Sequence, residues 1–133
     1  MTHAQQVPAK VRKVVYERDN HRCVWCHTGH DITIQRRQAT GMGGSHRLLN
    51  PSELVTLCLV HNQLAEGGWQ HGATRHGIKV RRNIGTLTCA DVPVYYHHHG
   101  VWRLLHTDGG FSDIEPVLAS ELIAATGFGK AGI

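Results

Sequence analysis

Two short pairs of metal-binding residues constrain this chain more than any other feature. Cys23 and Cys26 are separated by two residues, and Cys58 and His61 repeat that spacing later in the sequence. A tight turn aims both members of such a pair at one point, and zinc is held tetrahedrally by thiolates and imidazoles. The sequence therefore predicts a structural zinc ion, bound by three cysteines and one histidine, that fastens two distant segments together.

Two other interpretations of these cysteines are weaker. A disulfide leaves His61 without a role and requires an oxidising compartment, whereas the N-terminus carries no signal-peptide pattern. Unrelated buried cysteines would require two pairs of the same spacing to coincide by chance. No apolar run is long enough to span a bilayer. We therefore expect a soluble protein of the cytoplasm.

Positive charge gathers in two parts of this 133-residue chain, whose net charge is +4. Positions 10–47 contain eight basic and three acidic residues, and positions 75–82 add four basic residues and no acid. Clustered cations attract a nucleic-acid backbone. A basic surface without a partner gives the same pattern, so charge alone does not decide. The candidate nucleic-acid contacts are Lys10, Arg12, Lys13, Arg36, Arg37 and Arg47.

Residue patterns in the first half of the chain predict mixed α and β structure. Valines at helical spacing predict a helix from Pro8 to Arg18. Alternation predicts a strand over Ile32–Gln35. The glycine-rich segment from Gln38 to His46 is predicted as a loop. A second helix is expected from Leu59 to Glu66, ended by a pair of glycines.

The second half of the chain predicts further strands and an unanchored end. Alternation favours a short strand over Ile78–Val80 and a hairpin of Val92–Tyr96 and Val101–Leu105. His97–His99 lies in the hairpin turn, and we interpret it as an exposed loop rather than a transition-metal site. Cys89 is expected to be a small buried residue. The chain beyond Glu121 is expected to be mobile.

Four segments form a specific combination: Arg18-Asp19 before Cys23-Val24-Trp25-Cys26, Gln35 to Gly44 ending in Gly41-Met42-Gly43-Gly44, Leu57 to Asn62, and Val92-Pro93-Val94 with Asp108-Gly109-Gly110. This combination resembles the HNH endonucleases, in particular the small zinc-containing type found in actinobacterial phages. The resemblance covers about residues 8–113. It implies an α+β fold with a ββα-metal core, in which two strands and a helix hold one catalytic divalent ion and the zinc lies on the opposite side.

The resemblance also implies an activity and its residues. The family hydrolyses DNA phosphodiester bonds with Mg²⁺ or Mn²⁺, and its phage members often accompany the DNA-packaging terminase. Gln35 falls on the first ligand position for the catalytic ion, and Asn62 falls on the ligand position of the helix. Arg36 stands where the family has its general-base histidine, and Glu53 stands where it has its middle asparagine. Double-stranded DNA and a terminase are thus the implied partners, in a bacterial or phage-infected cell.

The residues at these positions depart from the family. Arginine stays protonated, so Arg36 cannot accept a proton from water. Gln35 and Asn62 are neutral amides, whereas hard cations prefer at least one carboxylate. One hypothesis is a nuclease whose base is supplied by His46, or by His30. Another is an HNH-like fold that binds nucleic acid without cleaving it, with Arg36 and Arg37 on phosphates.

A third hypothesis is a zinc-stapled protein that binds another protein through Tyr95, Tyr96 and Trp102. All three hypotheses share one expected organisation. Residues 1–7 form a flexible tail, and 8–113 form the HNH-like domain, with its zinc-stapled core at 18–68 and its C-terminal strands at 78–105. Residues 114–133 form a second tail.

Overall fold

The first helix forms where the sequence predicts it. Helix α1 spans Ala9–Arg18, and Pro8 precedes it at a position where a missing N–H costs no hydrogen bond. Val15 is fully buried on the face that packs against Leu49 and Leu54. Val7, expected in the tail, packs against the same cluster. The structure is a computed structural model, and it describes residues 7–39 and 48–128.

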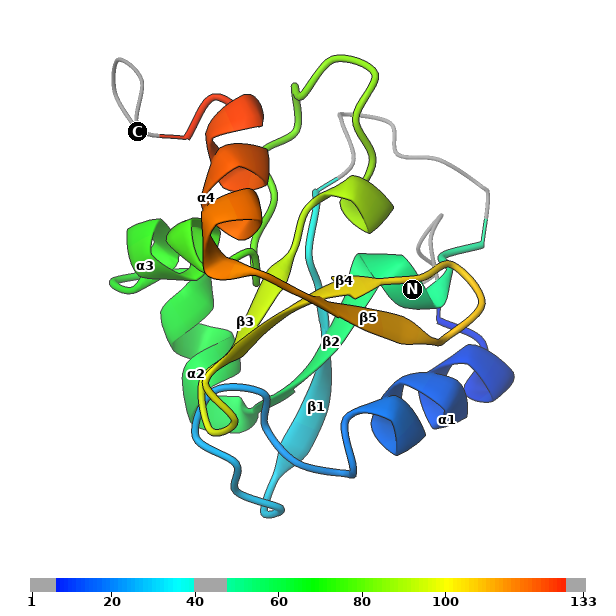
Figure 1. The fold of residues 1–133 in the computed structure, drawn as a ribbon. Helices are drawn as coiled ribbons and strands as arrows, with labels where there is room; N and C mark the ends of the chain where they lie inside the picture. The colour runs from blue at the N-terminus through cyan, green and yellow to red at the C-terminus, as the bar shows by residue number, and fades with distance from the viewer. Residues whose placement is uncertain (1–6, 40–47, 129–133) are drawn as a thin grey trace.

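Two strands and a helix follow one another around the predicted zinc ligands (Figure 1). Strand β1 (Ile32–Arg36) pairs antiparallel with β2 (Leu54–Cys58), with Ile32 opposite Cys58 and Arg36 opposite Leu54. A 3₁₀ turn, η1 (Pro51–Glu53), leads into β2. Helix α2 (Leu59–Ala65) begins directly after β2. The predicted strand and helix are therefore confirmed, and together with β2 they form a β1–β2–α2 unit.

The C-terminal half contains a second antiparallel sheet of three strands. The predicted hairpin is confirmed as β3 (Val94–Tyr96) and β4 (Val101–Leu105). A third strand, β5 (Phe111–Ile114), pairs with β4 and was not predicted. Its residues are mostly exposed, so they lack the apolar alternation that marks a half-buried strand.

The predicted strand over Ile78–Val80 is wrong. Val80 makes only an isolated parallel bridge with Gln38, because the chain reverses at Gly77 after the short helix α3 (Gln70–Arg75). Gly77 has a φ of 75°, and a Cβ there would lie 1.7 Å from the Pro93 carbonyl oxygen. Only glycine permits this turn. A second 3₁₀ turn, η2 (Cys89–Asp91), precedes β3, and Cys89 is buried as predicted.

The chain over 116–125 is anchored, which corrects the expectation of a mobile tail for this part, and 129–133 lie outside the described residues. Residues Pro116–Ala125 form helix α4, with proline in its first turn. Ala119 and Ile123, one turn apart, are buried, and Ile123 packs into a cluster with Val80 and Val92. No helix in the described residues has the length and apolar character that crossing a bilayer requires.

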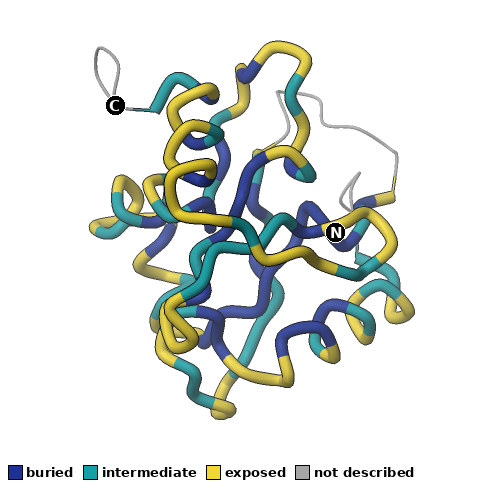
Figure 2. Tube along the Cα trace, viewed as in Figure 1, coloured by how far each residue is buried: buried dark blue, intermediate teal, exposed yellow. Residues whose placement is uncertain are grey.

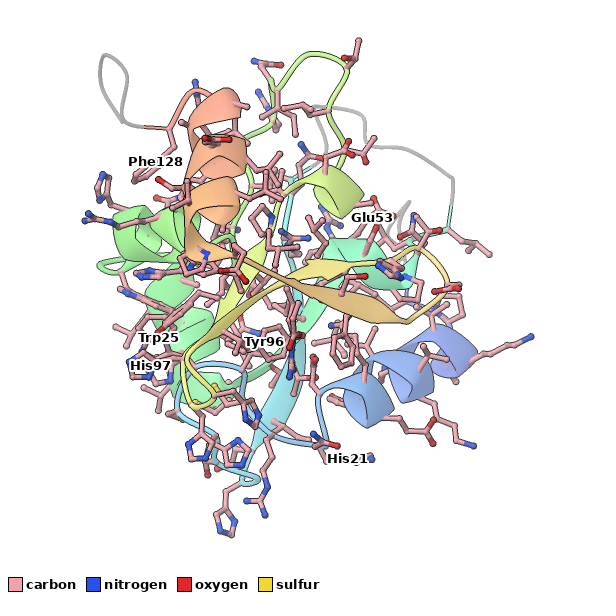
Figure 3. All side chains as sticks on the ribbon, viewed as in Figure 1. His21, Trp25, Glu53, Tyr96, His97 and Phe128 are labelled. Atoms are coloured by element: carbon pink, nitrogen blue, oxygen red, sulfur yellow. The ribbon has the colours of Figure 1, made fainter. Side chains whose placement is uncertain are left out.

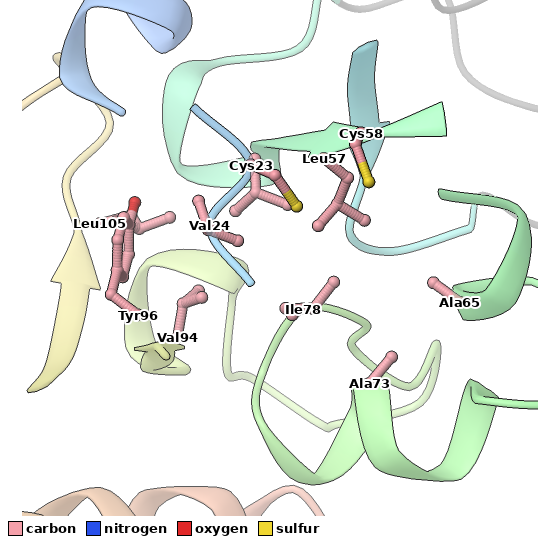
Figure 4. Packing of buried hydrophobic residues seen from close by; sticks show 11 residues of the cluster. Cys23, Val24, Leu57, Cys58, Ala65, Ala73, Ile78, Val94, Tyr96 and Leu105 are labelled. Carbon is pink, nitrogen blue, oxygen red and sulfur yellow. The ribbon is translucent and has the colours of Figure 1, made fainter. Parts of the chain in front are cut away.

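The largest core cluster lies beneath the zinc ligands. It joins Cys23 and Val24 to β2, α2, α3 and the second sheet (Figure 4). Strand β2, which contributes Val55, Leu57 and Cys58, is buried along its whole length (Figure 2). The cluster therefore holds the 23–26 turn, α2, α3 and both sheets together.

Candidate metal site and basic cleft

The four predicted zinc ligands come together. Their ligand atoms all lie within 4.8 Å of one another. Cys58 Sγ is 3.2 Å from His61 Nδ1, Cys26 Sγ is 3.8 Å from Cys58 Sγ, and Cys23 Sγ is 3.9 Å from His61 Nδ1. Tetrahedral zinc bonds of roughly 2.0–2.3 Å separate ligand atoms by roughly 3.3–3.8 Å. The donor set and its spacing therefore fit a zinc ion.

Local backbone structure aims these side chains at one point. The Cys23 N–H donates to the Thr28 carbonyl and the His27 N–H to the Cys23 carbonyl, which closes the turn around Cys26. Cys58 caps α2 and accepts from the His61 N–H. Burial lowers the pKa of His61, so its imidazole stays neutral, as a metal ligand must be.

The thiols themselves favour a cation between them. Partial burial raises the pKa of Cys26 to about 11, and the neighbouring thiols of Cys23 and Cys58 add to the effect against a backbone hydrogen bond that lowers it. Three thiolates repel one another in a confined site, and a divalent ion reverses this repulsion. These residues would thus hold zinc and, with it, the junction between the 23–26 turn and α2.

No family model, no curated protein and no solved structure matches this chain.

The two amides predicted to hold a catalytic ion are both engaged in hydrogen bonds. Gln35 is buried at the end of β1, and its Nε2 donates to Glu66 Oε2 at 2.7 Å and to the Arg36 carbonyl at 2.8 Å. Asn62 Nδ2 donates to Thr33 Oγ1 at 2.7 Å. Glu53 accepts from the Asn50 N–H in the capping box of η1. Gln35 and Asn62 thus lie on two neighbouring elements, β1 and α2, whereas the hydrogen bond of Glu53 stabilises the 3₁₀ turn η1.

Glu66 is the residue that sequence reasoning missed. It lies four positions after Asn62, one helical turn further along, and that spacing was the available signal. Its carboxylate accepts from Gln35 and from Lys79 Nζ at 2.6 Å. The hydrogen bond from Lys79 is the main reason that the pKa of Glu66 is lowered, and the bond from Gln35 assists against a partial burial that raises it. A carboxylate therefore lies beside Gln35, already paired with an ammonium group.

Arg37 is not a nucleic-acid contact, which corrects the prediction. Its guanidinium is fully buried and donates to the carbonyls of Ser52, Gly77, Cys89 and Val92 at 2.6–2.9 Å. Successive residues point to opposite faces of an extended chain. Arg36, next to it, is accordingly half-buried rather than buried.

The Arg18-Asp19 motif is also structural. Asp19 accepts from Arg18 Nε at 2.9 Å, from the Tyr96 hydroxyl at 2.6 Å and from the Thr56 N–H at 3.0 Å. Tyr96 is 3 % exposed and lies at the centre of the molecule in Figure 3. Tyr96 is therefore not part of an exposed surface, and the hypothesis of a protein-binding surface is wrong for this residue.

The histidines of the hairpin turn stack on neighbours. His97 stacks on Trp25 with ring centroids 4.4 Å apart (Figure 3), and His98 stacks on His27 at 3.8 Å. The turn therefore packs beside the Cys23–Cys26 segment. His46 and Arg47 lie outside the described residues. Of the predicted glycine-rich loop, the structure describes Gln38 and Ala39. His30 is exposed, in the turn before β1.

The remaining basic candidates lie on two surfaces. Lys10, Arg12 and Lys13 are exposed on α1. A separate cleft of about 540 Å³ lies between the end of α2, α3 and the segment 79–82. Three cations line it together with His71 and Glu66: Lys79, Arg81 and Arg82. Three of the four basic residues at positions 75–82 that the sequence indicates thus form one wall of a concave surface, and Arg75 does not line it.

Proposed function

We propose that this chain is a nucleic-acid-binding protein that carries an HNH-like β1–β2–α2 unit and does not cleave its ligand. The position of Lys79 carries the proposal. Its ammonium pairs with the Glu66 carboxylate that Gln35 also contacts, so the carboxylate beside the family's first ligand position is already neutralised by a cation. Arg36, at the base position of the family, is a permanent cation and cannot activate water.

The same residues suit a phosphate backbone. Lys79, Arg81 and Arg82 line one concave wall, and Arg36 ends the neighbouring strand. Guanidinium and ammonium groups on a concave surface bind phosphate oxygens and release counterions. Arg82 is exposed and is the cleft residue best placed to contact a ligand without supporting the fold.

Fluorescence anisotropy of labelled DNA, measured at several salt concentrations, tests the proposal. Wild-type protein should bind with an affinity that falls steeply with salt. Arg82→Ala should weaken binding about equally for different sequences and reduce the salt slope by about one. Arg22→Ala, which removes an exposed arginine outside the cleft, is the control and should bind as wild type does. Salt-independent binding, or equal losses in the two variants, would contradict the proposal.

A metal-dependent nuclease is the second candidate, because Glu66 supplies the carboxylate that Gln35 and Asn62 lack. Plasmid nicking with Mn²⁺ and with Mg²⁺ separates the two candidates. Nicking by wild type that disappears in Asn62→Ala and in Glu66→Gln would establish the nuclease and overturn the proposal. Silence in wild type with activity in Arg36→His would support an HNH-like unit that has lost its base.

A further inference from the structure

A second cavity lies on the other side of α3. It has a volume of about 260 Å³ and is lined by residues of α3, β4 and α4. Its walls combine the aromatic and apolar residues Trp102, Ile123, Ala124 and Phe128 with the polar residues Arg75, His76 and Ser120. None of its lining residues is a candidate zinc ligand or belongs to the β1–β2–α2 unit.

We propose that this cavity receives one unpaired base of a single-stranded nucleic acid, while the adjoining basic cleft holds the neighbouring phosphates. The inference rests on the proposed function and deepens it, because it specifies which form of nucleic acid the surface selects.

The ring faces in the cavity are held in place by their neighbours. His76 and Trp102 are nearly parallel, at an interplanar angle of 15° with centroids 6.1 Å apart. Tyr95 packs against both, at 5.5 Å and 5.1 Å. A bond between His76 Nδ1 and the Gly72 carbonyl, 2.9 Å long, fixes the imidazole. Rigid aromatic faces of this kind are the usual platform for a nucleobase, since every base has a π face.

The cavity and the cleft share a wall. His71 lines the cleft, and its ring contacts Phe128 of the cavity with centroids 5.0 Å apart. Arg75 lies one turn of α3 after His71 and faces the cavity. Arg81, on the cleft side, donates to the Thr126 carbonyl two residues before Phe128. A base and its phosphate, which are one sugar apart in a nucleotide, would therefore lie on either side of this wall.

The chemistry of the cavity selects an unpaired base. In a duplex the faces of the bases are covered by stacking and only their edges reach the grooves. A site built from ring faces needs a base that has left the stack, as in single strands and loops. Because stacking on a ring face does not distinguish one base from another, the preference should be for unpaired nucleotides rather than for a sequence.

The test compares three ligands by fluorescence anisotropy: a labelled strand of abasic residues that carries one central 2-aminopurine as its only base, the same strand with an abasic residue at that position too, and a fully paired duplex of the same length. The base-containing strand should bind about tenfold more tightly than the abasic strand, and its 2-aminopurine fluorescence should be quenched on binding. Phe128→Ala should abolish the difference and the quenching. Phe111→Ala, the same substitution at an exposed phenylalanine of β5, should retain both.

Each outcome decides between the proposals. Salt-sensitive binding that is equal for the base-containing, abasic and duplex ligands would overturn this inference and leave the proposed function standing. No binding of any ligand would overturn both. Equal behaviour of Phe128→Ala and Phe111→Ala would also overturn the inference. Arg75→Ala, which alters only the rim, provides a second variant should Phe128→Ala fail to fold, and it should weaken binding of the base-containing strand.

Discussion

At the scale of single residues, Arg37 shows how far a side chain can depart from its apparent role. Two adjacent arginines at the end of a strand suggest a phosphate contact, yet one of them is sealed inside. Its donors satisfy carbonyls of Ser52 in η1, of Gly77, of Cys89 in η2 and of Val92 directly after η2. A carbonyl that loses its water on folding costs free energy unless it finds another donor. Arg37 therefore joins three segments that lie far apart in the sequence: η1, the Gly77 turn and η2 with Val92.

Substitution of Arg37 should be severe. Arg37→Met keeps much of the volume but leaves four carbonyls without their donor, so the free energy of unfolding should fall by about 3–5 kcal/mol. Arg36→Met, at the half-buried neighbour, is the matched control and should cost less than about 1 kcal/mol. Urea denaturation of both variants measures the difference. Similar losses in the two variants would show that the buried bonds do not determine stability.

Glu66 gives a pH-dependent prediction at the same scale. Its pKa is below the ordinary value of 4.5 in the folded state, chiefly because of Lys79. A carboxylate with a lowered folded pKa stabilises the protein above its unfolded pKa, and that contribution disappears as the pH falls through the folded pKa. The stability difference between wild type and Lys79→Met should therefore be largest near neutral pH and shrink below pH 4.5.

The difference should stay below about 1 kcal/mol, because the Glu66 side chain is 53 % exposed and water screens the pair. Arg82→Met removes a cation from the same cleft, where no ion pair with Glu66 is seen among the described residues, so it should show no such pH dependence. Thermal unfolding at a series of pH values measures both. A difference that grows as the pH falls would contradict the assignment.

At the scale of elements, α4 shows why an apolar terminal segment can be misjudged. Its residues are apolar on several faces, so no stripe marks the buried side, and Val117 is 72 % exposed while Ile123 is 7 % exposed. The buried face covers the cluster of Val80, Ile84, Cys89 and Val92. The helix also completes the aromatic cavity, since its residues form one wall.

Shortening the buried Ile123 and the exposed Val117 should have different effects on stability. Ile123→Ala should lower the free energy of unfolding by about 2–4 kcal/mol, because it opens a cavity in a packed cluster. Val117→Ala, on the same helix, should change it by less than about 0.5 kcal/mol. Chemical denaturation monitored by tryptophan fluorescence distinguishes the two. A small effect of Ile123→Ala would mean that α4 is not docked on the cluster in solution.

At the scale of the whole molecule, the candidate zinc site joins the 23–26 turn to the start of α2, and both segments also contribute residues to the largest core cluster. The first cluster draws on the 23–26 turn, both sheets, α2 and α3, and two zinc ligands are themselves members of it. A chain of this size has a modest core, so a metal that fixes two segments contributes strongly to stability. Loss of zinc should therefore lower the stability of the whole domain and not of the site alone.

Removal of one ligand should release the metal and loosen the fold. Purified protein should contain one equivalent of zinc, and Cys58→Ala should lose it and melt about 10 °C lower or more. Cys89→Ala, the same change at a buried cysteine outside the site, should keep its zinc. Metal analysis and thermal denaturation together provide the measurement. Full zinc content in Cys58→Ala would exclude this cysteine as a ligand.

The sequence by itself determined the features that depend on local spacing. The candidate zinc ligands, α1, β1, α2 and the β3–β4 hairpin could all be predicted from the sequence. The paired ligands of a metal site, the apolar residues of a helix face and the alternating residues of a strand each recur at a fixed short spacing. Arg36 was also recognisable as unfit to be a base, since that follows from its own chemistry.

Only the tertiary structure decided which polar groups lose their water and which partners they then find. It buried Arg37 and left Arg36 half-exposed, set Lys79 on Glu66 beside Gln35, and brought Phe128 against His71 across the two cavities. Each of these contacts joins residues separated by many positions, and no periodicity in the sequence encodes such a distance. The proposed binding surface is therefore a property of the folded chain, whereas the candidate zinc site can be predicted from the sequence.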